Sequence, residues 1–517
     1  MRITRRNAMK MLTAAAATTG LVRPAPGAAH NLEIAKGPFQ GTRESLEQYE
    51  TPEWFRDAKF GLWAHWGPQS GVEDGDWYAR NMYIQGSDQY NYHVAHYGHQ
   101  SKVGFKDLIP QFKAAHWDPE HLISLYKAAG AKYFVSMGAH HDNFDMWNSK
   151  YQPRWNAKAV GPKRDIVGEW AKAARAQGLR FGVTEHLWIT YKWFTSSHGA
   201  DKTGPLAGVP YDGQDKAYSD LYTSDTTVYV PKLPWNSDNI PDSWRYHWYQ
   251  RIKDLVDNYH PDLLYTDGPL PFEEYGLNIV ANLYNLSAQR NGGKVDAVYN
   301  SKRQEDCTTG TCVLDVERGV VDQIWPKPWQ TDTCIGDWHY KRGIKYKTGK
   351  TVIDLLCDIV SRNGNLLLNI PLPNSGVPDD QELAVVADIT KWMSINSEGI
   401  YSTRPWKIFG EGPSTHAIKS GSSFNEKNRK DLTAEDVRFT TKQGTLYAFV
   451  MGVPTAPITI QALALGGAQN AGKIQNVEML GYGGKLKWHQ TSTGLTIQTP
   501  AEKPSEHATA FKVMGAI

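Results

Sequence analysis

Short apolar segments alternate with amphipathic stretches between about residues 31 and 396. The strand-like segments are Phe60–His65, Tyr133–Met137, Arg180–Thr184, Leu263–Thr266, Ala297–Asn300 and Leu366–Asn369. The stretches with helical periodicity are Pro119–Ala129, Asp165–Gln177, Trp244–Asn258 and Thr351–Arg362. This alternation is typical of βα units around a parallel sheet. Six or more such units predict a (β/α)8-like TIM barrel, in which chemistry belongs at the carboxyl ends of the strands.

The pattern changes after a last predicted helix, which ends near Asn396. From Tyr401 onward, Pro, Gly and Thr interrupt short alternating runs such as Thr445–Val450, Ile458–Gln461 and Leu495–Gln498. These runs predict antiparallel strands of a β-sandwich. We therefore divide the chain into a targeting segment (1–30), a barrel domain (31–400) with an irregular insertion at 195–242, and a C-terminal sandwich domain (401–517).

The N-terminus has the pattern of an export signal. A charged start is followed by the apolar run Met11–Val22 and by small residues up to Ala29, and Arg5–Arg6 stands in the twin-arginine position. The apolar run is shorter than the roughly 20 residues of a membrane span. We expect a cleaved twin-arginine signal and a periplasmic or extracellular protein without a membrane span. An ordinary secretory signal or an uncleaved anchor is the alternative.

Composition favours an uncharged partner. Lys and Arg total 56 and Asp and Glu total 54, so the formal net charge of +2 gives no field that would collect nucleic acid or anionic lipid. The 19 Trp and 26 Tyr supply flat rings, most of them for core packing, that can also stack on the apolar faces of sugars. A neutral partner is what this composition favours, and the oligomeric state stays open.

The four cysteines, Cys307, Cys312, Cys334 and Cys357, are too few and too scattered for a disulfide scaffold or a paired zinc site. Cys307 and Cys312 could close a small loop in an oxidising compartment. The alternative is four buried thiols.

Three predicted strands end in residues that can carry chemistry. Asp267 follows one strand and is itself followed by Gly-Pro, which turns the chain away; alone, such a tripeptide is an ordinary turn. His65 ends another strand, and His140–His141 follow a third. The paired histidines lack a Glu or a third His at metal-ligand spacing, and neighbours on a strand point to different faces. We therefore predict hydrogen bonds to sugar hydroxyls and no metal.

Further motifs surround these residues and give the chain a family resemblance. They are Trp54–Gly61, His65–Gly67, Lys132–Phe134, His140–Phe144, Trp147–Lys150, Lys163–Val167, Thr333–Trp338, Asn363–Asn369 and Ser397–Trp406. In this order they resemble glycoside hydrolase family 29 α-L-fucosidases, over about residues 53–406. Ordered matches of this kind are more specific than any single motif.

The resemblance implies roles for several residues. It makes Asp267, at the end of strand four, the nucleophile that attacks the anomeric carbon. Substrate contacts are implied or considered for His65, Asp76, Trp77, His140, His141, Tyr265 and, near C6 of the sugar, Trp329 with Trp325 and Trp338. Asp76 stands where the family usually has Glu, so its carboxylate reaches one methylene less far.

The acid/base residue is less clearly marked. Glu317, within Leu314–Gly319, resembles the family's loop that carries this acid, and Glu185 and Glu305 are the rivals. At Glu185–His186 the family usually has a Tyr pair, so both residues become candidates for contacts specific to this chain. Arg303 matches a family Arg that touches the sugar, with Lys302 as the alternative register.

These roles imply a retaining exo-α-L-fucosidase. An ionised Asp267 attacks while a protonated Glu317 donates to the leaving oxygen, and this chemistry requires no metal or organic cofactor. An exo-α-L-galactosidase is the closest alternative, because L-galactose is L-fucose with a hydroxyl on C6. A carbohydrate-binding protein without turnover is the more distant one. Linkage, aglycone and sulfation stay open.

Overall fold

The computed structural model describes residues 30–223, 233, 235–416, 423–429 and 431–517. The predicted signal peptide therefore lies, except for His30, outside the described residues. The chain divides into two compact units, Met1–Glu33 and Ile34–Ile517. In the described end of the first unit, the Asn31 side-chain amide donates to Glu33. All elements discussed below belong to the second unit.

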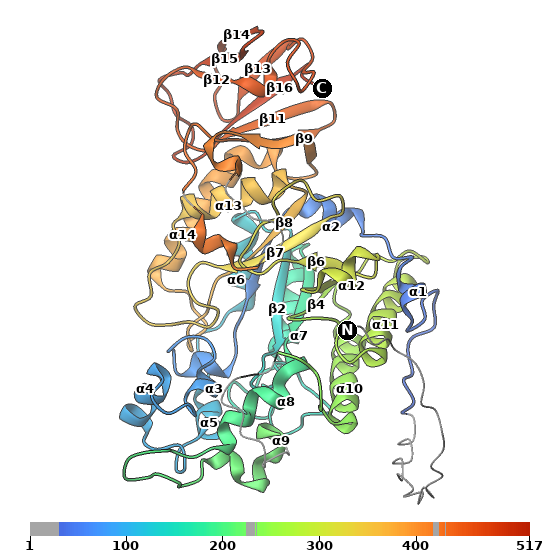
Figure 1. Cartoon of the computed structure of the whole chain (residues 1–517), viewed down its shortest axis with the longest axis vertical. Coiled ribbons are helices and arrows are strands. Elements are labelled where there is room, and N and C mark those ends of the chain that lie inside the picture. The colour runs from blue at the N-terminus through green and yellow to red at the C-terminus, as the bar shows by residue number, and fades with distance from the viewer. Residues whose placement is uncertain (1–29, 224–232, 234, 417–422, 430) are drawn as a thin grey trace, which may run out of the picture. The chain divides into compact units, whose positions relative to one another are not determined.

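Eight parallel strands close into a barrel in chain order, which confirms the predicted architecture (Figure 1). They are β1 (Phe60–Ala64), β2 (Tyr133–Ala139), β3 (Arg180–Glu185), β4 (Leu263–Thr266), β5 (Val298–Ser301), β6 (Val313–Asp315), β7 (Trp329–Cys334) and β8 (Gly364–Asn369). The six predicted strands coincide with observed ones to within two residues. The sequence pattern missed β6 and β7, because β6 has only three residues and β7 carries the polar run Gln330–Thr333.

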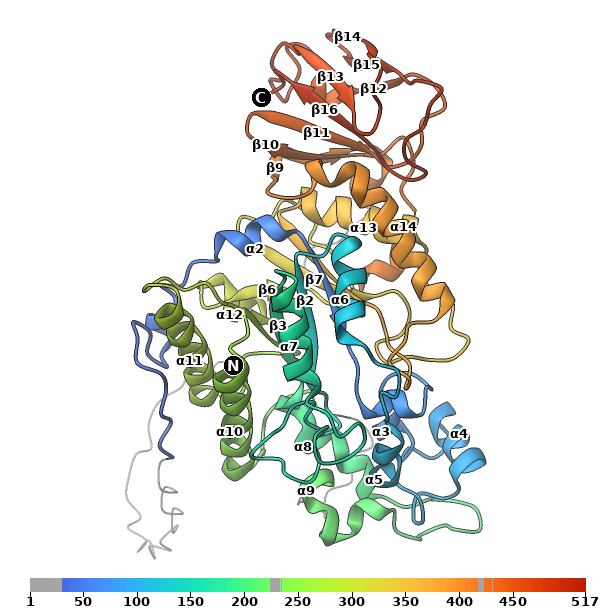
Figure 2. The same ribbon diagram turned by 180° about the vertical axis from the view of Figure 1, so that it is seen from behind.

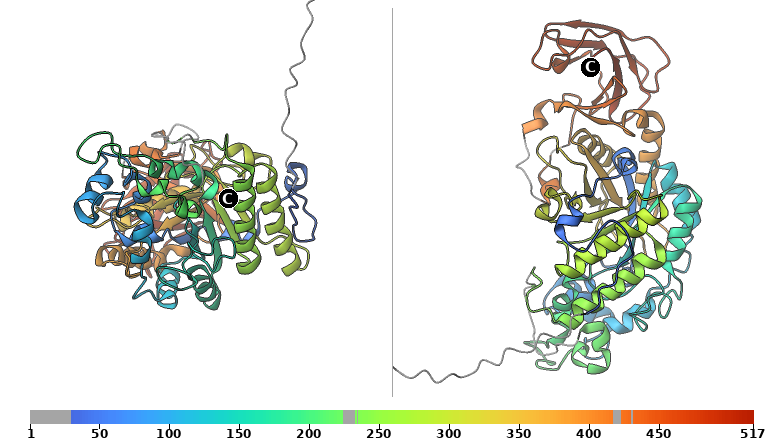
Figure 3. Two further views of the ribbon diagram at one scale, coloured as in Figure 1. Left: turned by 90° about the horizontal axis from the view of Figure 1, so that it is seen from below. Right: turned by 90° about the vertical axis from the view of Figure 1, so that its right-hand side faces the viewer.

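Helices cover the outside of the barrel and its loops. The longer ones are α4 (Asp88–Tyr97), α6 (Pro119–Ala128), α7 (Ile166–Ala176), α10 (Asp242–Tyr259), α11 (Glu274–Arg290), α13 (Gly349–Ser361) and α14 (Asp380–Asn396). Short ones are α1 (Arg43–Leu46), α2 (Glu53–Ala58), α3 (Tyr78–Asn81), α5 (Phe105–Leu108), α8 (Thr190–Trp193), α9 (Ser219–Tyr222) and α12 (Gln304–Thr308). Figure 3 shows α10 and α11 side by side, and Figure 2 shows α3, α5, α8 and α9 gathered at one end of the barrel. None of the helices in the described ranges combines the length and the apolar character that crossing a bilayer requires.

Local sequence signals set where the helices begin. The Asp118 carboxylate accepts from the backbone N–H groups of Glu120 and His121, and Pro119 occupies the first turn, where it loses no hydrogen bond. Asp379 and Glu382 form a reciprocal capping box at the start of α14. α11 was not predicted, because Gly276 and several Asn residues lower its intrinsic helix propensity.

The C-terminal region forms two antiparallel sheets, as predicted. The strands are β9 (Arg404–Glu411), β10 (Val437–Lys442), β11 (Thr445–Val450), β12 (Ile458–Ile460), β13 (Asn476–Met479), β14 (Lys487–Thr491), β15 (Gly494–Gln498) and β16 (Thr509–Met514). Five strands are ordered β13-β16-β11-β10-β9 and three are ordered β12-β15-β14. Phe439, Leu446, Leu495 and Phe511 from both sheets are fully buried in one core, as in a sandwich.

A buried ion cluster joins α13 to β10. Asp358 contacts Arg362 at 3.2 Å, Arg429 at 2.8 Å and Arg438, and the Asp358, Arg362 and Arg438 side chains are almost fully buried. Burial alone would raise the pKa of Asp358, but the three guanidinium groups outweigh burial and hold it well below its usual range.

Asp358→Asn should therefore destabilise the protein by about 3–5 kcal/mol, because it leaves buried guanidinium charges without their partner. Thermal unfolding followed by circular dichroism measures this loss. The control Asp380→Asn changes a carboxylate in the first turn of α14, outside this cluster. A melting temperature for Asp358→Asn equal to that of the control would contradict the prediction.

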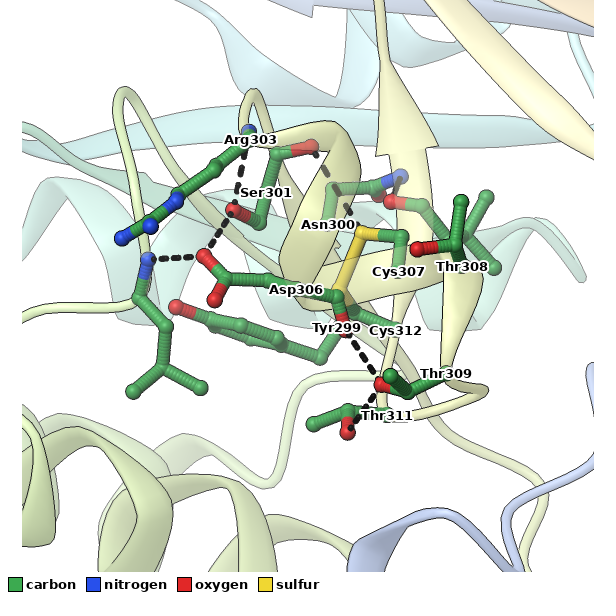
Figure 4. The surroundings of a disulfide bond; sticks show 12 residues. Tyr299, Asn300, Ser301, Arg303, Asp306, Cys307, Thr308, Thr309, Thr311 and Cys312 are labelled. Carbon is green, nitrogen blue, oxygen red and sulfur yellow. Dashed lines mark hydrogen bonds between the residues drawn. A yellow bond between two sulfur atoms is a disulfide. The ribbon is translucent and has the colours of Figure 1, made fainter. Parts of the chain in front are cut away.

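Cys307 and Cys312 form a disulfide across the loop between β5 and β6 (Figure 4), the first of the two alternatives considered. Cys334 and Cys357 are buried free thiols. Burial raises the pKa of Cys334 to about 12, so this thiol is protonated and unreactive at neutral pH.

Candidate active site

A pocket of about 460 Å³ opens at the carboxyl ends of the barrel strands. Its size falls within the roughly 300–1,000 Å³ usual for small-molecule sites. It is lined by Trp63, His65, Asp76, Trp77, His140, His141, His186, Trp188, Trp235, Asp267, Gly268, Lys302, Glu317, Asp332, Trp338 and Phe424. The structure thus brings together every predicted site residue except Glu185, Tyr265, Arg303 and Trp329.

The backbone around Asp267 is fixed on both sides. The Asp267 N–H donates to the Glu185 carbonyl at 3.0 Å, and the Trp188 indole donates to the Asp267 carbonyl. Gly268 has φ of +153°, and a Cβ there would lie 2.3 Å from the Trp188 indole nitrogen. Only glycine fits at this position, so the Gly after the carboxylate allows the close approach of Trp188.

Two histidines, a lysine and a phenol surround the Asp267 carboxylate. Oδ2 lies 3.1 Å from His186 Nδ1 and 3.6 Å from His141 Nε2, and Oδ1 lies 3.5 Å from Lys302 Nζ. The Tyr265 hydroxyl is 3.4 Å from Oδ1. Burial alone would raise the pKa of Asp267, but His186 and Lys302 outweigh it and hold the pKa well below its usual range. Asp267 is therefore ionised at neutral pH, as a nucleophile must be.

Lys302 lies between Asp267 and three further carboxyl groups. Its Nζ is 3.2 Å from Glu317, 3.3 Å from Asp315 and 3.0 Å from Asp332. Burial lowers the pKa of Lys302, but these carboxylates outweigh burial and raise it well above its usual range. The ammonium group therefore stays charged and holds the two catalytic candidates, Asp267 and Glu317, near each other.

Glu317 follows β6, and its carbonyl accepts from the Phe424 N–H at 2.7 Å. Burial, Asp267 and Asp332 raise the pKa of its carboxyl, Lys302 lowers it, and the net result is a pKa of about 7. The pocket thus contains one carboxylate that is ionised and one carboxyl that is half protonated at neutral pH. Such separated pKa values are the electrostatic requirement for a nucleophile beside a general acid.

Further histidines line the pocket together with Asp76. Asp76 lies 2.6 Å from His339 Nδ1 and 3.6 Å from His140 Nε2, and Gln69 hydrogen-bonds His140 at 2.9 Å. Burial followed by the neighbouring histidines lowers the pKa of His65 and His140 well below the usual range, so both rings are neutral. Neutral rings both donate and accept hydrogen bonds, which suits sugar hydroxyls.

Two groups in this part of the pocket also have the spacing of metal ligands. His65, Asp76, His140 and His339 offer ligand atoms within 4.8 Å of one another, and so do His140, His141 and His186. Sequence spacing missed the first group, because Asp76 and His339 come from distant loops.

Glu185 does not face the pocket. It ends β3 and pairs with Thr266 of β4, and its carboxylate accepts from Thr266 Oγ1, the Trp248 indole and the Leu187 N–H at 2.6, 3.0 and 3.0 Å. Side chains alternate along a strand, so Glu185 points toward α10 and the next residue, His186, points into the pocket. The geometry does not support Glu185 as substrate contact or acid/base.

Three other predicted contacts lie outside the pocket lining. Tyr265 is buried beneath it and donates to Asp332 at 3.0 Å. Trp329 is the first residue of β7, at the amino end of the strand, where it bonds the Arg362 carbonyl, and the site is at the carboxyl end. Arg303 is more than half exposed and lies 3.5 Å from Glu305, and its N–H bonds Ser301 (Figure 4). Lys302, the alternative register, takes the place predicted for Arg303.

Sequence reasoning missed several lining residues. Asp332 lies on the unrecognised β7, and its adjacent motif at Thr333–Trp338 was the available signal. Trp188 lies in the short segment Leu187–Ile189 that follows β3, and Trp235 comes from the irregular insertion. Phe424 comes from the C-terminal region, about a hundred residues after Glu317, and no sequence signal could have placed it in this pocket.

A second cavity of about 510 Å³ lies beside the Cys307–Cys312 disulfide. It is lined by Tyr49, Glu50, Thr51, Arg56, Gln304, Cys307, Thr308, Gly310, Cys312, Leu314, Trp325, Pro326, Lys327 and Pro328. Among these described residues Glu50 is the single carboxylate, so this cavity lacks the paired carboxyl groups found around Lys302.

Comparison with known proteins identifies relatives over nearly the whole chain. The alpha-L-fucosidase family model matches residues 28–398, and a model of the alpha-L-fucosidase C-terminal domain matches residues 429–514. The chain is 28% identical to human tissue alpha-L-fucosidase over 95% of both chains, and 27% identical to an alpha-L-fucosidase of Branchiostoma floridae over 93% of this chain and 96% of that one. The structure of Thermotoga maritima alpha-fucosidase in complex with fucose matches with a TM-score of 0.69 and 25% identity, covering 92% of this chain and all of that one.

Proposed function

Because the chain belongs to the alpha-L-fucosidase family of glycoside hydrolases, we propose that it removes terminal α-L-fucosyl residues with retention of configuration, using Asp267 and Glu317. The observation that carries the assignment of residues is the position of Lys302, which lies within 3.5 Å of both carboxyl groups. The comparisons do not favour the α-L-galactosidase alternative.

The proposed reaction has two steps. Asp267 attacks the anomeric carbon of fucose, and the bond to the leaving oxygen breaks as Glu317 gives that oxygen its proton. Glu317 then takes a proton from water, which attacks the anomeric carbon and releases fucose and free Asp267. Retaining enzymes hold their two carboxyl groups about 5–5.5 Å apart, closer than inverting ones. The shared contact with Lys302 supports this close spacing.

We assign the histidines of the pocket to the hydroxyl groups of fucose. His65 Nδ1 and His339 Nε2 are buried without a protein partner, so a sugar hydroxyl would satisfy a polar atom that is otherwise costly to bury. His339 also fixes the shortened acidic side chain, Asp76, through its 2.6 Å contact. Trp77, His140, His141 and His186 complete the proposed sugar contacts.

Hydrolysis of p-nitrophenyl α-L-fucoside and p-nitrophenyl α-L-galactoside by the purified protein tests this function. We expect the fucoside to be preferred, and we expect proton NMR to detect α-L-fucose before the β anomer. A preference for the galactoside would show that L-galactose, and not L-fucose, is the sugar that the protein releases. Early appearance of β-L-fucose would show that the mechanism inverts the configuration.

The pH dependence should follow from Glu317. Bond cleavage requires its protonated form, which is present below its pKa of about 7 and is lost as the pH rises through that value. kcat/KM for an α-L-fucoside should thus fall roughly tenfold per pH unit on the alkaline side. α-L-Fucosyl fluoride, whose leaving group needs no proton, is the control, and its kcat/KM should stay nearly constant over the same pH range. An equal decline for both substrates would contradict the role of Glu317.

We further propose that the protein is exported by the twin-arginine route. Arg5–Arg6 ahead of the apolar run supports this, and the Cys307–Cys312 disulfide suits an oxidising compartment. Replacing both arginines by lysine should keep the chain in the cytoplasm, as measured by cell fractionation. Unchanged export would argue for a different route.

A further inference from the structure

An outer cavity of about 510 Å³ adjoins the active-site pocket. It is lined by Trp188, Trp235, Asn236, Ser237, Asp238, Gly268, Pro269, Lys302, Arg303, Gln304 and Glu305. Trp188, Trp235, Gly268 and Lys302 line both spaces. Since Lys302 lies beside Asp267 and Glu317, the outer cavity begins where the bond to the leaving group would be cleaved.

Trp235 presents an aromatic surface between the two spaces. Its side chain is 58% exposed, the most exposed of the large hydrophobic residues in the described part of the chain. Its ring centroid lies 5.6 Å from that of Trp77 and 6.3 Å from that of Trp188, at tilted angles. An exposed indole supported by two others contributes nothing to the core, and it offers a flat apolar face to a ligand.

The charges around the outer cavity are balanced. The Lys302 ammonium group is already surrounded by carboxyl groups, and Arg303 lies 3.5 Å from Glu305. Asp238 adds a further negative charge to the lining. A sulfated or carboxylated ligand would meet these acids without finding an uncompensated cation among the described lining residues, so an uncharged ligand is favoured.

We propose that the outer cavity is an aglycone subsite that binds a neutral sugar unit, with one face of that sugar stacked on Trp235. This inference rests on the proposed fucosidase function and deepens it, because it makes a fucosylated neutral oligosaccharide the substrate class. Asn236, Ser237 and Gln304 supply polar side chains for the hydroxyl groups of that sugar.

The test compares a neutral fucosyl-lactose trisaccharide, the same trisaccharide with a sulfate on the sugar next to fucose, and α-L-fucosyl fluoride, which has no aglycone. The measured quantity is the ratio of kcat/KM for the neutral trisaccharide to kcat/KM for the fluoride. Trp235→Ala should lower this ratio at least about tenfold, because binding energy from the remote sugar is lost only for the trisaccharide. Trp235→Phe should restore most of it. Leu465→Ala, which truncates another exposed apolar side chain, is the control.

An unchanged ratio in Trp235→Ala, with both substrates affected equally, would show that Trp235 only shapes the fucose pocket and would overturn the subsite. Faster cleavage of the sulfated than of the neutral trisaccharide by the wild-type protein would contradict the proposal that the subsite binds a neutral sugar. If the wild-type protein cleaves neither fucosyl fluoride nor any fucoside, the proposed function itself fails and the subsite with it.

Discussion

Replacing Asp267 by Asn should lower kcat for an α-L-fucoside by about 10⁴-fold or more, a loss of the size found when a member of a catalytic group is removed. The amide has nearly the same shape as the carboxylate, but it has no charge with which to attack the anomeric carbon. The substitution also removes the negative charge that helps to raise the pKa of Glu317. Steady-state kinetics with p-nitrophenyl α-L-fucoside measure the loss, and thermal unfolding shows whether the fold is kept.

Asp254→Asn is the matched control for this substitution. Asp254 lies on α10 and accepts from the Trp147 indole at 3.0 Å, away from the pocket lining. It should keep nearly wild-type activity. A folded Asp267→Asn protein that retains a tenth or more of the wild-type kcat would exclude Asp267 as the nucleophile.

Replacing Asp267 by Gly gives a second test of its role as the nucleophile. Asp267→Gly leaves room for azide beside the anomeric carbon, on the face from which the carboxylate attacks. Azide then displaces the aglycone in one step, so the product should be β-L-fucosyl azide, with inverted configuration. Formation of the α anomer would be inconsistent with attack from this face.

The barrel could be predicted from the sequence because most of its strands are apolar and buried on both faces. β7 was not recognised as a strand because it carries polar residues, and one of these residues belongs to the site. Its polar run Gln330–Thr333 gives no apolar pattern, and Asp332 within this run lies 3.0 Å from Lys302 in the site. A strand that carries site residues is therefore harder to recognise from its hydrophobic pattern than one that only fills the core.

Assignments to single residues were less secure than assignments to segments. Neighbours on an extended chain face opposite sides, so an error of one position moves a side chain out of the site. Two pairs of neighbours illustrate this. Of Glu185 and His186, only His186 lines the pocket, and of Lys302 and Arg303, only Lys302 does. The contribution of Phe424 depends on how a C-terminal loop packs against Glu317, which no local pattern encodes.

Glu317→Ala should reduce kcat/KM strongly for α-L-fucosides with poor leaving groups and much less for α-L-fucosyl fluoride, because only the former need a proton. With the fluoride, the fucosyl-enzyme still forms quickly and should accumulate, because no general base activates the water that hydrolyses it. Azide needs no base, so it should restore turnover and give α-L-fucosyl azide, whose configuration is retained through two displacements. The opposite anomers from Asp267→Gly and Glu317→Ala would separate the nucleophile from the acid/base residue.

Glu185→Ala is the decisive comparison for this assignment. Glu185 is fully buried among Thr266, Trp248 and the Leu187 N–H, and burial raises the pKa of its carboxyl. Its removal leaves those donors unpaired, so Glu185→Ala should lower the melting temperature, whereas Glu185→Gln should recover part of the loss. Azide should have no effect on either variant, because their fucosyl-enzyme still has Glu317 to activate water. Rescue of Glu185→Ala by azide, together with no rescue of Glu317→Ala, would transfer the acid/base role to Glu185 and require β3 to turn its last side chain toward the pocket when substrate binds.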